Sequence, residues 1–162
     1  MARSMRPTRR RALGIAPGII ILGAFAAVAL GSPGSGITNS ELKVPQATLN
    51  PVHLNSDRVK FQTKGPTFVR VHTLTIAPGG RTGWHHHPGF VLVAVQAGTV
   101  TAFDPQCNAT PHPEGTAFVE YGDEPLEVRN LGDKPATVYA TYVDPTKGAG
   151  AFRIEDPVQD CR

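Results

Sequence analysis

Three consecutive histidines, His85, His86 and His87, are the residues of this chain whose type and spacing best suit chemistry. They lie between strand-like segments, and on an extended backbone alternate side chains share a face. We therefore expect His85 and His87 to point the same way and His86 to face the opposite way. Two imidazoles on one face can hold a divalent metal from one side. The sequence thus predicts a metal or ligand site around His85 and His87.

The elements that must position these histidines read as short β-strands. Segments rich in Val, Thr and aromatic residues alternate with Gly- and Pro-containing turns, and twelve prolines from Pro45 onward interrupt nearly every helical period. This pattern predicts an all-β sandwich or barrel. The polar, breaker-rich segment 39–50 is expected to be a linker or an edge segment. The predicted strands are 59–63, 67–76, 90–95, 99–103, 116–121, 126–130 and 137–143.

Two motifs carry a family resemblance. The first is Gly83-Trp84-His85-His86-His87-Pro88-Gly89, followed by an apolar run and Gly98. The second opens at Pro113-Glu114-Gly115-Thr116 and ends at Val128-Arg129-Asn130. Together they resemble the two motifs of the cupin superfamily, in outline its small, single-domain, exported bacterial members. The resemblance implies a cupin-like antiparallel β-barrel (double-stranded β-helix or jelly roll) over residues 51–162, often with a divalent metal.

The metal-ligand set that the resemblance implies is incomplete in this chain. In the family, a Glu follows the second histidine by four to five residues, where this sequence has Val91 and Leu92. A further His stands four residues before the closing Asn, where this sequence has Leu126. Two imidazoles alone would hold a metal weakly, so a bound metal needs another ligand.

Glu124 is the predicted third ligand. It lies two residues before Leu126 on an expected strand, so the two side chains share a face, and Glu127 faces the other way. Trp84 and Leu126 are candidate ligand-binding residues, with a core position as the alternative for Trp84. His72 and His112 are weaker metal candidates.

Three interpretations of the histidine pair stay open. The pair could be a hydrogen-bonded or solvated part of the barrel mouth. It could hold Fe, Mn, Ni or Zn together with Glu124. It could also line a metal-free pocket in which His85 or His87 binds an acidic or carbonyl ligand.

The N-terminal residues have the anatomy of an export signal. Residues 1–31 combine a basic start with an uncharged apolar segment, residues 12–31, and Thr8-Arg9-Arg10-Arg11 resembles a twin-arginine signal. They are expected to be either a cleaved signal peptide or a membrane anchor. Residues 32–50 are expected to be a linker. The predicted location is extracellular or in the cell envelope, with membrane contact only through the N-terminal segment.

The charge distribution argues against a nucleic-acid partner. Five of the sixteen Lys and Arg residues precede position 12, and from Glu41 onward 11 Lys and Arg face 13 Asp and Glu. The sequence pI near 9.1 therefore reflects the N-terminal segment.

Two cysteines, Cys107 and Cys161, fit an exported domain, because neither belongs to a Cys-x-x-Cys pair and both can pair in an oxidising compartment. We expect a disulfide between them, with two free thiols as the alternative.

Three functions remain open from the sequence. The first is an exported or tethered module that binds a small molecule, and a divalent metal with it, at the barrel mouth. The second is a metal-dependent oxygenase or isomerase. The third is a structural or interaction domain, and a homodimer is one form of partner. Nothing in the sequence names a substrate.

Overall fold

The structure is a computed structural model that describes residues 32–145 and 152–161. The predicted signal or anchor, residues 1–31, lies outside these ranges. The described residues form twelve strands, and no helix among them is long and apolar enough to cross a membrane. The strands are β1 (Ser35–Leu49), β2 (His53–Asn55), β3 (Lys60–Gln62), β4 (Thr67–Arg81), β5 (His85–His86), β6 (Phe90–Ala97), β7 (Thr99–Phe103), β8 (Ala109–Pro113), β9 (Ala117–Glu120), β10 (Glu127–Arg129), β11 (Ala136–Asp144) and β12 (Ile154–Glu155).

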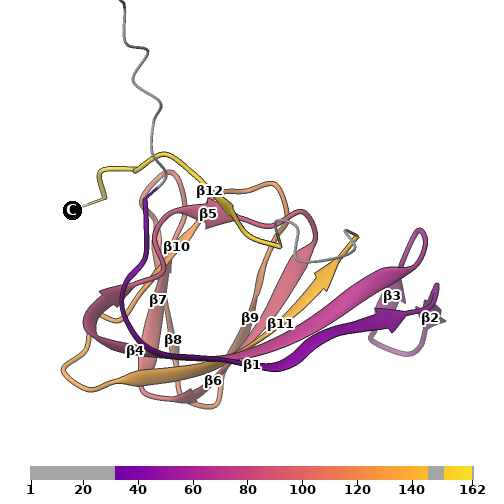
Figure 1. The fold of residues 1–162 in the computed structure, drawn as a ribbon, viewed down its shortest axis with the longest axis horizontal. Coiled ribbons are helices and arrows are strands. Elements are labelled where there is room, and N and C mark those ends of the chain that lie inside the picture. The colour runs from indigo at the N-terminus through magenta and orange to yellow at the C-terminus, as the bar shows by residue number, and fades with distance from the viewer. Residues whose placement is uncertain (1–31, 146–151, 162) are drawn as a thin grey trace, which may run out of the picture.

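The main sheet curls into a nearly closed antiparallel barrel. Its strands follow the order β8-β7-β10-β4-β11-β6-β9, and β1 pairs with β4. Strands β8 and β9 lie at opposite ends of this order, yet only residues 114–116 separate them in the chain. The two ends of the sheet must therefore approach each other, and Figure 1 shows the strands arranged around a common interior. The predicted all-β barrel is confirmed.

The core of the barrel follows from the alternation of side chains along its strands. In β6, Val91, Val93 and Val95 are buried, whereas Leu92 between them is exposed. The inward residues pack against matching residues of β7, β10 and β11. This is the period-two pattern of a sheet with one face on the core. The buried core consists of Ile76, Val91, Val93, Val95, Val100, Val128, Ala136, Val138, Ala140 and Tyr142.

The segment expected to be a linker is a strand. Residues Ser35–Leu49 form β1, which runs antiparallel to β4 with several register shifts. Its side chains are mostly exposed, so its composition is that of a polar edge strand and not of a core strand. Residues 35–49 are therefore an edge strand, as the second interpretation of this segment predicts. The interpretation of residues 32–50 as a linker is wrong, because most of them pair with β4.

The end of the chain lies across one end of the barrel. We call residues 152–161 the C-terminal strap. Its strand β12 pairs with the histidine strand β5, and Figure 1 shows the two side by side over the barrel. The predicted disulfide between Cys107 and Cys161 is present and attaches the strap to the segment after β7. The histidines are thus held between the barrel and the strap.

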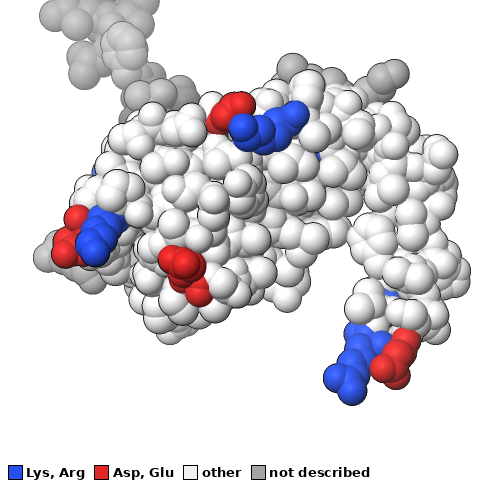
Figure 2. All heavy atoms as spheres, turned by 90° about the horizontal axis from the view of Figure 1, so that it is seen from below, with Lys and Arg blue, Asp and Glu red and all other residues white. Residues whose placement is uncertain are grey.

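The charged residues of the barrel surface are scattered. On the face shown in Figure 2, acidic and basic side chains lie mostly in small mixed groups, one acidic group stands alone, and no broad area of one sign is visible. The β2–β3 hairpin carries one such pair, Arg58 and Asp57, at its exposed turn.

Candidate metal centre

The three histidines divide between two faces of β5. The rings of His85 and His87 lie edge to face with their centroids 4.9 Å apart, and both side chains are buried. His86 is half-buried and its Nδ1 lies 2.8 Å from a carboxylate oxygen of Asp156 in the strap. This is the alternation that an extended backbone imposes.

Glu120 brings a carboxylate to the two inward histidines. It is the last residue of β9, and its Oε2 lies 3.1 Å from Nε2 of His87 and 3.9 Å from Nε2 of His85. Each of the three residues offers one ligand atom, and these atoms all lie within 4.8 Å of one another. All three side chains are buried. Within the described ranges this group is the candidate metal centre.

The outer nitrogens of both rings are occupied by backbone carbonyls. Nδ1 of His85 lies 2.8 Å from the carbonyl oxygen of Gly83, and Nδ1 of His87 makes a short hydrogen bond with the carbonyl oxygen of Phe152. A carbonyl only accepts, so both Nδ1 atoms must carry the hydrogen. In the neutral rings, the two Nε2 atoms then have no proton and direct their lone pairs toward Glu120.

Burial keeps His85 neutral. Desolvation, the nearby charge of Arg153 and the neighbouring His87 lower the pKa of His85 to about 3, although the hydrogen bond to Gly83 opposes the shift. A neutral imidazole with a free Nε2 is the form that binds a metal. The local environment therefore favours the metal-binding form of this ring at neutral pH.

Glu124, the predicted third ligand, does not belong to this group. Its side chain is exposed and lines a second cavity, on the side of β9 and β10, whose lining includes Glu120. The turn 122–125 lies outside the strands, so the alternation that predicts an inward Glu124 does not apply to it. The carboxylate that lies beside the two histidines is that of Glu120.

Glu127 also differs from expectation. Its side chain was expected to face outward, but it is 1% exposed. Arg129 covers it, with Nε and Nη2 each 2.6 Å from Oε2, and Arg81 lies 3.8 Å from Oε1. Two cationic side chains therefore replace solvent around this carboxylate.

The two candidate ligand-binding residues lie beside the histidines in different ways. Trp84 is 1% exposed and packs with Phe103 and Cys161, so it occupies the core position that was its alternative. Leu126 is directly opposite His85 in an antiparallel bridge and is partly buried against the core. Residues paired in this way project to the same side of a sheet.

The two weaker metal candidates are not part of the group. His112 stacks on Phe118, with ring centroids 4.0 Å apart, and lines the same second cavity as Glu124. His72 lies against Tyr142 and Phe152 in a larger cavity. Burial lowers the pKa of both rings, and the charge of Arg70 also lowers that of His72.

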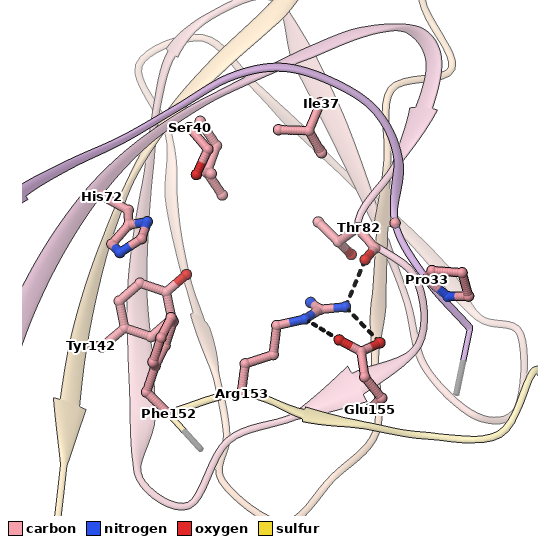
Figure 3. Close-up of a pocket in the computed structure, with 11 residues that line it drawn as sticks. Pro33, Ile37, Ser40, His72, Thr82, Tyr142, Phe152, Arg153 and Glu155 are labelled. Carbon is pink, nitrogen blue, oxygen red and sulfur yellow. Dashed lines mark hydrogen bonds and ion pairs between the residues drawn. The ribbon is translucent and has the colours of Figure 1, made fainter. Parts of the chain in front are cut away.

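The larger cavity, of about 750 Å³, adjoins the candidate metal centre. A small space next to His85 and Glu120 shares part of its lining with this cavity, namely Leu74, Thr82, Tyr142 and Arg153. Figure 3 shows the side chains of Arg153, from the strap, and Tyr142, from β11, among the residues that line the cavity. A small molecule in this cavity would therefore lie close to the metal ligands.

Comparison with known proteins does not identify the function of this site. No protein-family model matches the chain, and no curated protein matches it. Among solved structures, a double-stranded β-helix protein from Klebsiella pneumoniae is 18% identical, with a TM-score of 0.47 over 54% of this chain and 75% of that one. A cupin domain from Bordetella pertussis is 18% identical, with a TM-score of 0.42 over 59% of this chain and 97% of that one.

A third similar structure is a sugar phosphate isomerase of the cupin superfamily from Silicibacter pomeroyi. It is 25% identical, with a TM-score of 0.41 over 45% of this chain and 48% of that one. Similarities this low transfer no activity or substrate. The nearly closed antiparallel barrel with an inward histidine pair at its end agrees with the fold that the cupin resemblance of the two sequence motifs predicts.

Proposed function

We propose that this chain is an exported barrel protein that binds a divalent transition metal through His85, His87 and Glu120 and a small molecule in the adjoining cavity. One observation carries the metal proposal. Three buried groups face one another: both Nδ1 atoms donate to backbone carbonyls, so the two Nε2 atoms, which carry no proton when the rings are neutral, are directed toward a carboxylate. Such an arrangement is unfavourable until a cation or a proton lies among the three atoms.

The position of Glu120 compensates for the carboxylate missing from the cupin-like motif. The family resemblance places that Glu at position 91 or 92, and in the structure Val91 is the direct cross-strand partner of Glu120. Directly opposite residues in an antiparallel pair have Cβ atoms about 5 Å apart and project to the same side. A carboxylate lost from β6 is thus replaced from β9 at nearly the same place.

The chemical types of the three ligands limit which metal ions can bind. Two imidazoles and one carboxylate suit Fe, Mn, Ni or Zn, and such a metal acts as a Lewis acid when bound. Three protein ligands leave coordination positions for a water or a small molecule. In this chain the residues that orient the ligands are Gly83 and Phe152, through their carbonyl oxygens.

Zinc titration calorimetry of single variants tests the proposal. Glu120→Gln keeps the size of the side chain and removes its charge. We expect this change to weaken zinc binding at least about 100-fold, because loss of a residue that only orients a ligand already weakens metal binding by up to that factor. Glu124→Gln is the matched control and should leave the affinity unchanged. Equal zinc affinity of the parent and Glu120→Gln would contradict the proposed centre.

A compensating pair of substitutions sharpens the test. Glu120→Val alone should abolish zinc binding, whereas Val91→Glu combined with Glu120→Val moves the carboxylate to its cross-strand neighbour and should restore much of it. Restoration would also support the relation to the cupin motif. A double variant that folds, by circular dichroism, but binds no zinc would contradict the compensation argument.

A metal-dependent enzyme is the second candidate function, and the open coordination positions beside the cavity favour it. Azide titration of the cobalt-loaded protein tests whether a small molecule can reach the metal, which the enzyme requires and the binding module allows. A change in the visible cobalt spectrum that saturates with azide agrees with both candidates, and the enzyme must in addition convert a bound substrate. A spectrum that does not respond means a closed, structural metal centre and contradicts the enzyme.

Export is supported by two features. The basic and apolar residues 1–31 have signal character, and the Cys107–Cys161 disulfide suits an oxidising compartment. Fractionation of the cells that make the protein, followed by N-terminal sequencing, tests it. Protein found in the cytoplasm with reduced cysteines would contradict export.

A further inference from the structure

Arg153 presents hydrogen-bond donors to the cavity. Its Nε and Nη2 bond to both carboxylate oxygens of Glu155, and Nη2 also donates to the carbonyl oxygen of Thr82, 2.7 Å away. These bonds fix the plane of the guanidinium (Figure 3). Nη1 makes no hydrogen bond within the described ranges, so its two hydrogens remain for a ligand.

Tyr142, on β11, supplies a further donor to the cavity. Its hydroxyl extends toward the cavity in Figure 3, and no hydrogen bond to it is found among the residues that the structure describes. A tyrosine hydroxyl carries its proton at neutral pH and can therefore donate a hydrogen bond. The ring is fixed between those of His72, His87 and Phe152. A rigid ring holds the hydroxyl in one place.

The rest of the cavity is mainly apolar. Ile37 and Pro33 line the side near β1, and Leu74 and Phe152 line the sides nearer the barrel and the strap. Cavities of a few hundred Å³ and more, with mostly apolar walls and a few convergent polar groups, are typical small-molecule sites. The convergent groups in this cavity are donors, whereas its carboxylate, Glu155, is already paired with Arg153.

The charges and donors around the cavity favour a carboxylate as the ligand. Arg153 and Glu155 form a neutral pair, and the lowered pKa of His72 leaves that ring neutral at pH 7. Nη1 of Arg153 is the cationic donor that these contacts leave unused within the described ranges, and a carboxylate accepts hydrogen bonds from such a donor.

We propose that the cavity binds a small amphipathic carboxylate, with its carboxylate group at Arg153 and Tyr142 and its apolar part along Ile37, Leu74 and Phe152. This inference rests on the proposed function, because it names the class of molecule that lies next to the metal. Arg153 and Tyr142 bind the ligand directly. The planar guanidinium and the fixed hydroxyl select a carboxylate over a neutral amide of the same shape.

Calorimetric titration with benzoate and benzamide tests the inference, because the two probes share a ring and differ in charge. For the zinc-loaded protein we expect benzoate to bind at least about tenfold more tightly than benzamide, because hydrogen bonds to a charged group are stronger than those to a neutral one. Arg153→Gln should remove this preference and change zinc affinity less than about threefold, since a group that binds no metal affects it only through its charge. Tyr142→Phe, which keeps the core ring, should weaken benzoate binding alone.

The controls separate this inference from the metal proposal. Arg58→Gln removes an arginine from an exposed Arg–Asp pair that does not line the cavity, so it should leave benzoate binding unchanged. Equal affinity for the two probes, or a benzoate preference that survives both Arg153→Gln and Tyr142→Phe, overturns the inference while zinc binding leaves the metal centre intact. If the parent binds no zinc, the metal proposal fails, and the same titrations on the zinc-free protein decide the carboxylate inference by the same criteria.

Discussion

Removal of the Cys107–Cys161 disulfide should weaken metal binding, although neither cysteine belongs to the donor group. The disulfide anchors the C-terminal strap, and the strap supplies the carbonyl of Phe152 that bonds to Nδ1 of His87. It also pairs β12 with β5 along the histidines. Without its anchor the strap should separate more often from β5, and His87 would then lose the group that fixes its ring.

Two magnitudes follow. The cysteines are 54 residues apart, and the loop-closure relation gives about 4 kcal/mol of unfolding free energy for a loop of this size. Loss of a group that orients a metal-binding histidine typically lowers metal affinity about 10- to 100-fold. Cys107→Ala combined with Cys161→Ala should therefore lower both the unfolding free energy and the zinc affinity.

Urea unfolding and zinc calorimetry on the same samples measure the two effects. Val100→Ala is the control, because it removes buried core volume from β7 at a cost of about 2 kcal/mol without touching the strap. It should lower the unfolding free energy and leave zinc affinity within about twofold, since it removes no group that orients a ligand. If the folded double cysteine variant binds zinc as tightly as the parent, the strap does not orient His87 and the reasoning is refuted.

Three other predictions concern His72, Trp84 and Leu126. Burial lowers the pKa of His72, so the contribution of this ring to stability is present above pH 6.5 and is lost as the pH falls below that value. Proton NMR of the ring should give a pKa below 6.5, and the Phe152→Ala variant, which exposes the ring, should return the pKa toward 6.5. An unchanged pKa in that variant would contradict burial as the cause. Trp84→Ala should cost about 3–5 kcal/mol of unfolding free energy, measured by circular dichroism in urea, and a loss below about 1 kcal/mol would contradict its place in the core. Leu126→His places an imidazole opposite His85 and should tighten zinc binding in calorimetry, whereas unchanged affinity would mean that this side chain does not reach the metal.

The sequence carried most of the information about the barrel. The alternation in β6, the Gly- and Pro-containing turns and the two cupin-like motifs predict an antiparallel barrel, and the structure contains one. Alternation also predicts the opposite directions of His85 and His86, because that relation depends only on neighbouring residues of one strand. β1 was harder to recognise, since an edge strand with exposed side chains has no apolar alternation to reveal it.

The third ligand depends on information that no single strand contains. Glu120 reaches the histidines because the register of β9 against β6 places it opposite Val91. The alternation of Phe118 and Glu120 in β9 was a usable signal, since it marks Glu120 as inward-facing. Glu124 was chosen instead by extending the face of Leu126 into a turn, where the period of two no longer holds.

The contact of the Phe152 carbonyl with His87 and the burial of Glu127 beneath two arginines are also not predictable from the pattern of a single strand. The contact between His87 and Phe152 joins residues 65 positions apart in the chain, and a backbone carbonyl leaves no signature in the side-chain pattern. The alternation with Leu126 along the expected strand predicts that Glu127 faces outward. Its partner Arg129 lies two residues away on β10, whereas Arg81 comes near it only through the pairing of β10 with β4.

Metal content of the untagged protein is the most direct measurement of the central claim. Elemental analysis by mass spectrometry of protein purified without a histidine tag or chelator should find close to one Fe, Mn, Ni or Zn per chain, and the metal should be absent from Glu120→Gln prepared in parallel. A parent protein that contains no such metal, and that takes none up on dialysis against zinc, would contradict the account.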